Sequence, residues 1–142
     1  MFQMTIERAL QEHSVAKGYC LYLFRDGETI LYVGRSHRPL ERLREHLGWG
    51  EYEAQASHLG DIILKQFPGS LAWTVDFYTL AECQDLVAQC RPEYALWFEE
   101  QIKKNLVREA SEIAEEVFIE HYRPCLNIAG NSQGQLLPEK YR

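Results

Sequence analysis

Hydrophobic positions follow a strand pattern and then a helical pattern between residues 19 and 48. Residues 19–24 are aromatic or aliphatic throughout and residues 29–33 are β-prone, while residues 25–28 have the composition of a turn, which predicts a β-hairpin. Residues 39–47 then carry three leucines at helical spacing, with Pro39 suited to a first helical position and Gly48 suited to a stop. The pattern therefore predicts a hairpin that runs directly into a short helix.

The rest of the chain is mainly helical in pattern. Apolar residues at helical spacing predict helices at residues 3–14, 54–66, 81–89, 92–106 and 107–122, the last two either separate or continuous. Residues 72–80 alternate between apolar and polar side chains, as a third strand would. We therefore expect an α/β fold of the α+β kind, a small three-stranded, mainly antiparallel sheet flanked by helices. A single domain over residues 1–142 is expected, ending in a mobile tail at about 129–142.

The formal net charge of −6 is unevenly distributed over the 142 residues. Residues 1–50 carry seven basic and six acidic side chains, a balance of +1, whereas residues 51–142 carry eight and fifteen, a balance of −7. An acidic chain argues against nonspecific coating of nucleic acid, because that mode needs surplus Lys and Arg. Four arginines nevertheless surround the Gly34 turn: Arg35, Arg38, Arg42 and Arg44. A local anion site on an acidic body is therefore expected.

Nothing in the sequence suggests a membrane or an oxidising compartment. The chain has no run of about 18 apolar residues, and its N-terminus has neither a basic leader nor an apolar signal core. The four cysteines are scattered without a C-x-x-C pair, so neither a zinc site nor a disulfide framework is indicated. We expect a soluble cytoplasmic protein with reduced and mostly buried thiols, and no membrane partner.

One carboxylate of the helix expected near residues 108–122 lies on the apolar side. The other glutamates gather toward one solvated side, whereas Glu115 falls between Phe118 and Ile119 and in line with Tyr122. A half-buried carboxylate must be paired, hydrogen-bonded or bound to a metal, because an isolated one costs several kcal/mol. Glu115 is therefore either a structural carboxylate, paired with an arginine or reaching water, or a functional group.

Several of these residues stand in the order of a known motif. The order runs through Cys20-Leu21-Tyr22, Tyr32-Val33-Gly34, Arg42, His46, Glu115, Ile119, Pro124 and Asn127. It resembles the GIY-YIG nuclease superfamily over residues 18–47 and 112–127, with Cys20 at a position where the family usually has Gly. A Tyr-Val-Gly turn or an Arg-x-x-x-His helix occurs by chance, so the resemblance depends on the order and spacing of the whole set.

The resemblance implies metal-dependent hydrolysis of a phosphodiester bond in nucleic acid, with DNA the expected substrate. Tyr22 would be the general base or the phenol that positions water, with Tyr32 beside it, and Arg42 would neutralise the scissile phosphate. His46 would share the base role or bind a phosphate oxygen. Glu115 would hold one divalent ion, Mg²⁺ or Mn²⁺, and one carboxylate is enough because Mg²⁺ commonly keeps several waters.

Five further residues are expected to bind substrate on this interpretation: Gly34, Arg35, Ser36, Arg38 and Asn127. Each functional interpretation has an ordinary alternative when it is taken alone. Tyr22 and Tyr32 could be strand aromatics, Arg42 and His46 could form a solvated helix face, and Asn127 could be a turn residue.

Two alternatives to an active endonuclease stay open at the level of sequence. The fold could be a catalytically silent module that binds nucleic acid or a protein, as the acidic second half and Cys20 suggest. It could also be a nuclease subunit to which a partner delivers DNA, because the chain has no zinc finger or basic tail. Residues 48–110 are longer than a minimal member needs, and their aromatics fit either core packing or a docking surface for a second copy or a protein partner.

The hairpin supplies a geometric prediction. Two tyrosines that serve one site must lie on the same face, and directly opposed residues of an antiparallel pair have a constant index sum. A two-residue turn at residues 26–27 gives an odd sum of 53 and places Tyr22 and Tyr32 on opposite faces. We therefore predict a loop with an odd number of residues or a β-bulge, with Gly27 at positive φ.

Overall fold

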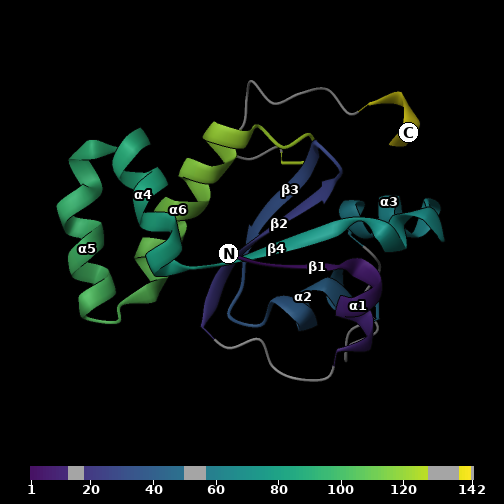
Figure 1. Ribbon diagram of the computed structural model, residues 1–142, viewed down its shortest axis with the longest axis horizontal. Coiled ribbons are helices and arrows are strands. Elements are labelled where there is room, and N and C mark those ends of the chain that lie inside the picture. The colour runs from purple at the N-terminus through teal and green to yellow at the C-terminus, as the bar shows by residue number, and fades with distance from the viewer. Residues whose placement is uncertain (13–17, 50–56, 128–137, 142) are drawn as a thin grey trace.

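A computed structural model describes residues 1–12, 18–49, 57–127 and 138–141. The strands are β1 (Phe2–Thr5), β2 (Tyr19–Asp26), β3 (Thr29–Arg35) and β4 (Thr74–Thr79). The helices are α1 (Ile6–Gln11), α2 (Pro39–His46), α3 (His58–Lys65), α4 (Leu80–Cys90), α5 (Ala95–Lys103) and α6 (Val107–Tyr122), with 3₁₀ turns η1 (Gly69–Ala72), η2 (Pro92–Tyr94) and η3 (Glu139–Tyr141). Figure 1 shows these elements around one central sheet.

The sheet has four antiparallel strands in the order β1-β4-β2-β3, so the α+β class is confirmed and the expected number of three strands is wrong. The additional strand is β1, which overlaps the start of the stretch predicted as a helix over residues 3–14. Phe2 pairs with Phe77 and Met4 pairs with Val75, and the buried Met4 lies between two exposed neighbours. Strand alternation therefore holds over these four residues, and the helix begins only at Ile6.

The hairpin between β2 and β3 contains the bulge that the shared face of the two tyrosines requires. Asp26 opposes Thr29 across Gly27 and Glu28, and Arg25 opposes Ile30, but Phe24 opposes Tyr32. Leu31 is therefore the extra residue, and the index sum changes from 55 to 56 along the ladder. With an even sum Tyr22 and Tyr32 share a face, and Gly27 has a φ of 56°. The predicted bulge is confirmed.

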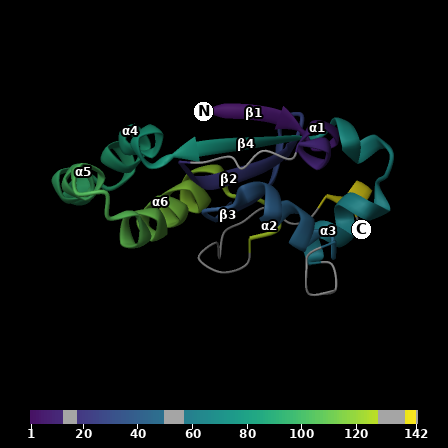
Figure 2. The same cartoon turned by 90° about the horizontal axis from the view of Figure 1, so that it is seen from below.

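Helices cover both faces of the sheet (Figures 1 and 2). On one face Tyr22, Phe24 and the bulged Leu31 join a core with the leucines of α2 and the apolar side of α3. On the other face Leu23 and Val33 join a second core with α4, α5 and α6. The strands β2 and β3 are thus buried on both sides, which explains why residues 19–24 are apolar throughout.

The middle of the chain follows its helical pattern with shifted boundaries. Within the predicted segment 54–66, α3 begins at His58, because Ser57 caps it by accepting a hydrogen bond from the Gly60 amide; residues 54–56 lie outside the described residues. The two last helical patterns are separate helices, because Asn105 adopts a left-handed conformation at the end of α5. In the part of the chain that the structure describes, no helix is both long and apolar enough to cross a membrane.

Residues 138–141 are docked on the sheet, so the prediction of a mobile tail does not hold for them. Tyr141 is 2% exposed and packs edge-on against Trp73. Its hydroxyl donates to Asp26 Oδ2 at 2.6 Å, and Lys140 Nζ forms an ion pair with the same oxygen. Residues 140 and 141 therefore hold the hairpin turn, while residues 129–137 and 142 of the predicted tail lie outside the described residues.

Candidate active site

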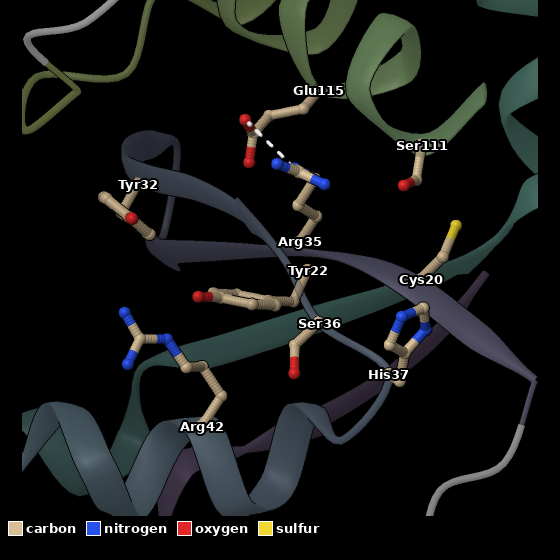
Figure 3. A pocket seen from close by; sticks show the side chains of 9 residues that line it. All are labelled: Cys20, Tyr22, Tyr32, Arg35, Ser36, His37, Arg42, Ser111 and Glu115. Atoms are coloured by element: carbon tan, nitrogen blue, oxygen red, sulfur yellow. Dashed lines mark ion pairs between the residues drawn. The ribbon is translucent and has the colours of Figure 1, made fainter. Parts of the chain in front are cut away.

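A cavity of about 430 Å³ lies at the β3 edge of the sheet, where α2 and α6 approach from opposite sides (Figure 3). It is lined by Cys20, Tyr22, Tyr32, Arg35, Ser36, His37, Arg42, Ser111 and Glu115. These side chains come from the consecutive elements β2, β3, the loop after β3 and α2, and from α6, which lies more than 60 residues later in the sequence. Of the five residues predicted to be catalytic, four line this cavity: Tyr22, Tyr32, Arg42 and Glu115.

The fifth, His46, lies behind Tyr22. His46 is 2% exposed, and its Nε2 lies 3.0 Å from the Tyr22 hydroxyl, while its Nδ1 lies 2.6 Å from Ser57 Oγ. Both residues project from α2, but Arg42 lines the cavity whereas His46 is buried behind the Tyr22 ring and does not line it. The structure therefore does not place His46 against a phosphate, and any part it takes in the chemistry passes through Tyr22.

The Ser57 hydroxyl and the Tyr22 hydroxyl bind the two ring nitrogens of His46. Ser57 Oγ accepts a hydrogen bond from the Gly60 amide and lies 2.6 Å from His46 Nδ1, whereas its contact with the His46 carbonyl oxygen is 3.4 Å long. In the tautomer with its proton on Nδ1, the ring donates to Ser57 and Nε2 accepts the proton of the Tyr22 hydroxyl; the other tautomer reverses both hydrogen bonds. Burial, together with the Arg42 charge, lowers the pKa of His46 to about 4, so the imidazole is neutral at pH 7.

The close approach of Gly34 to Tyr22 holds the phenol in position. The two residues oppose each other across the hairpin, and a Cβ added at Gly34 would lie 2.5 Å from Tyr22 Cζ. Real Cβ atoms do not approach an aromatic ring so closely, so only glycine leaves room for the ring. The structure shows that Gly34 leaves room for Tyr22, and the substrate contact expected of Gly34 stays a prediction.

Burial controls the ionisation of both phenols. Burial raises the pKa of Tyr22 well above its usual range, and Tyr32 beside it acts in the same direction, while Arg42 opposes the rise. Burial and then Glu115 raise the pKa of Tyr32. The two rings lie 6.2 Å apart between centroids on the shared face. Neither group is a phenolate at neutral pH, so Tyr22 would have to act as a neutral hydroxyl.

Two arginines supply positive charge to the cavity, and each is paired. Arg42 Nη1 lies 2.8 Å from Glu45 Oε2 on the same helix. Arg35 reaches across to α6, where its ion pairs with Glu112 and Glu115 are 3.5 Å and 3.7 Å long (Figure 3 shows the second). Pairs of this length at partly exposed positions contribute little to stability, so the arginines remain able to contact an anion.

Glu115 is the half-buried carboxylate that the helical pattern predicted. Its side chain is 28% exposed, and burial raises its pKa, an effect that Arg35 partly offsets. At 3.7 Å the Arg35 contact is longer than a hydrogen bond, which leaves carboxylate oxygens directed at the cavity. Among the described residues no group of three or more His, Cys, Asp and Glu side chains could hold a metal. A single carboxylate in a wet cavity fits Mg²⁺, which keeps several waters, and does not fit a fully protein-ligated metal.

The remaining predicted substrate contacts divide into two groups. Arg35 and Ser36 line the cavity, and Ser36 Oγ accepts a hydrogen bond from the Arg38 amide at the start of α2. Arg38 itself is 71% exposed and pairs with Glu41 outside the cavity lining.

Asn127, like Arg38, does not line the cavity, because its side chain is hydrogen-bonded to the backbone of Val33. Its side-chain carbonyl oxygen accepts a hydrogen bond from the Val33 amide, and its side-chain amide donates a hydrogen bond to the Val33 carbonyl, both at 2.8 Å. The polar groups of Asn127 thus fasten the chain after α6 to the edge strand β3. This is a structural task, in agreement with the alternative that the sequence left open.

The structure adds site residues that the sequence analysis did not select. Cys20, His37 and Ser111 line the cavity, and Ser57 orients His46 from the N-cap of α3. Cys20, at the position where the resembled family usually has Gly, is buried, and β2 shifts register against β4 there. The capping position of Ser57 could have been read from the sequence, but its contact with His46 could not.

The chain was compared with protein families, with curated proteins and with solved structures. None of these three comparisons found a match.

Proposed function

We propose that this protein hydrolyses phosphodiester bonds in nucleic acid, with DNA as substrate, in the manner of the GIY-YIG nucleases that its sequence resembles. The proposal rests on the convergence of Tyr22, Tyr32, Arg42 and Glu115 in one cavity from four different elements. Phenols, an arginine and a half-buried carboxylate are the groups that this hydrolysis needs. The four free cysteines suit a reducing cytoplasm, where we place the activity.

The pair of Tyr22 and His46 would position the attacking water. With the Tyr22 proton directed at His46 Nε2, a lone pair of the phenol oxygen is free to accept a hydrogen bond from water in the cavity. A pKa of about 4 makes His46 too weak a base to keep the proton of that water, so the proton would pass to solvent. The resulting hydroxide would attack phosphorus, the bond to the 3′ oxygen would break, and that oxygen would take a proton from solvent.

Arg42 would neutralise charge on the phosphate. It lines the cavity beside Tyr22, and it can exchange its exposed contact with Glu45 for a phosphate oxygen. Glu115 is the residue that would hold Mg²⁺, on the opposite side of the cavity (Figure 3). A bound Mg²⁺ would supply Lewis acidity at the leaving oxygen.

Cleavage assays on a panel of substrates test the proposal. Labelled single-stranded, duplex, flap and junction DNA, and the corresponding RNA, are incubated with the protein and Mg²⁺ or Mn²⁺. We expect cleavage of at least one substrate, and Glu115→Ala should slow it by roughly 100-fold or more. Glu112→Ala is the matched control, because it removes the other carboxylate paired with Arg35 and leaves the cavity lining intact.

Two results would count against the proposal. Cleavage by Glu115→Ala at the wild-type rate would remove the carboxylate from the chemistry. Binding of nucleic acid without turnover on every substrate would instead favour the silent module. That alternative has one supporting observation, since Arg35 and Arg42 already have carboxylate partners without a bound phosphate or metal.

A further inference from the structure

A second cavity of about 220 Å³ adjoins the first and is not used by the proposed chemistry. Its apolar wall is formed by Leu80 at the start of α4, Ile102 near the end of α5 and Val107 at the start of α6. The helices α4 and α5 belong to the segment that exceeds the resembled motif. The additional segment therefore builds a cavity beside the candidate active site.

The two cavities share a wall. Cys20 and His37 line both, and Figure 3 shows these two residues together at one end of the first cavity. The two cavities are therefore adjacent, and a ligand that occupied both would pass Cys20 and His37. The size limits what enters, because sites for whole small molecules commonly occupy about 300–1,000 Å³. One flat ring system fits this space better than a complete ligand.

Polar groups lie at the rim of the apolar wall. Asn105 follows α5 at a φ of 57°, which Asn tolerates and which the Leu106 amide stabilises by bonding to the Gln101 carbonyl. Among the described residues, none forms a hydrogen bond with the Asn105 side-chain amide or the His37 ring. An amide pairs with the edge of a base through one donor and one acceptor.

We propose that the second cavity receives one unstacked nucleobase, that of the nucleotide next to the scissile phosphate, and so determines base preference at the cut. The inference rests on the proposed function, since the phosphate in the first cavity places the nucleotide. The base lies against the apolar wall of Leu80, Ile102 and Val107, and Asn105 reads its edge. Such a site favours single-stranded or distorted substrates, because a base within a duplex would first have to leave the stack.

The test measures binding and does not require turnover. Each of the four deoxynucleoside 5′-monophosphates and the base-free 2-deoxyribose 5-phosphate are titrated into the protein with Mg²⁺, followed by calorimetry or backbone NMR. At least one monophosphate should bind about tenfold more tightly than the base-free compound, as contact with one base allows. Val107→Phe fills the cavity and should abolish this preference. Leu106→Phe adds similar bulk to the exposed neighbouring residue outside the lining and should retain it.

A second variant tests the inference even if Val107→Phe does not fold. Asn105→Gly keeps the positive φ and removes the amide, so it should reduce discrimination among the four bases while thermal unfolding stays cooperative. Equal binding of all five compounds by the wild type would overturn the inference, as would a preference that survives both substitutions. If a monophosphate binds more tightly than the base-free compound and no substrate is cleaved, the base site is supported and the hydrolytic function is contradicted. If a substrate is cleaved and all five compounds bind equally, the hydrolytic function is supported and the base site is contradicted.

Discussion

The buried imidazole of His46 makes the stability of this protein depend on acid in a way that can be calculated. In the unfolded chain the His46 pKa has its ordinary value of 6.5, and in the folded protein burial and Arg42 lower it to about 4. Between these two values the unfolded state binds more protons than the folded state. The stability contribution is therefore complete above pH 6.5 and is lost as the pH falls toward 4.

The magnitude follows from the size of the shift. Each unit of pKa difference corresponds to about 1.4 kcal/mol, so wild type should lose about 3 kcal/mol of unfolding free energy between pH 7.5 and pH 4 through this group alone. Such a loss is a large part of the roughly 5–15 kcal/mol that stabilises a typical domain. Acid unfolding should therefore begin while His46 is still titrating.

Other groups titrate over the same range, so the assay compares wild type with His46→Gln. Urea unfolding is measured at half-unit steps of pH for both proteins, and the difference between the two free energies isolates the imidazole. The variant should be less stable at neutral pH and lose less stability toward pH 4. Parallel profiles would refute the buried, neutral imidazole, as would NMR titration of His46 with a pKa near 6.5.

Two further predictions concern the cavity. Gly34→Ala should destabilise the protein by about 1–3 kcal/mol in urea unfolding and reduce cleavage, because its Cβ would overlap the buried Tyr22 ring; Gly69→Ala, where an added Cβ meets nothing within 4 Å, is the control, and equal effects would contradict the argument. Arg42→Ala should lower kcat by about 100-fold or more with little change in KM, since its contact strengthens in the transition state, whereas Arg38→Ala should weaken binding slightly. Equal losses in both arginine variants would indicate a diffuse basic patch.

The sequence alone determined those features that depend on neighbours along the chain. The hairpin was predicted from an apolar run, a β-prone run and the turn residues between them, and α2, β4, α4 and α6 were predicted because their apolar residues recur with periods of two or 3.6. Glu115 was selected by the same periodicity, which placed one carboxylate on an apolar helix side. β1 was missed because it has only four residues, too few for its alternation to be separated from the helical pattern that follows.

Tertiary structure decided what each side chain of the motif does. Arg42 and His46 project together from α2, yet α3 covers one and leaves the other in the cavity, since Ser57 and Gly60 pack against the end of α2. Gly34 admits a ring from the opposing strand, and Asn127 bonds to a backbone 94 residues away. These are contacts between segments distant in sequence, and no local pattern encodes them, because a residue's environment is set by whatever element folds onto it.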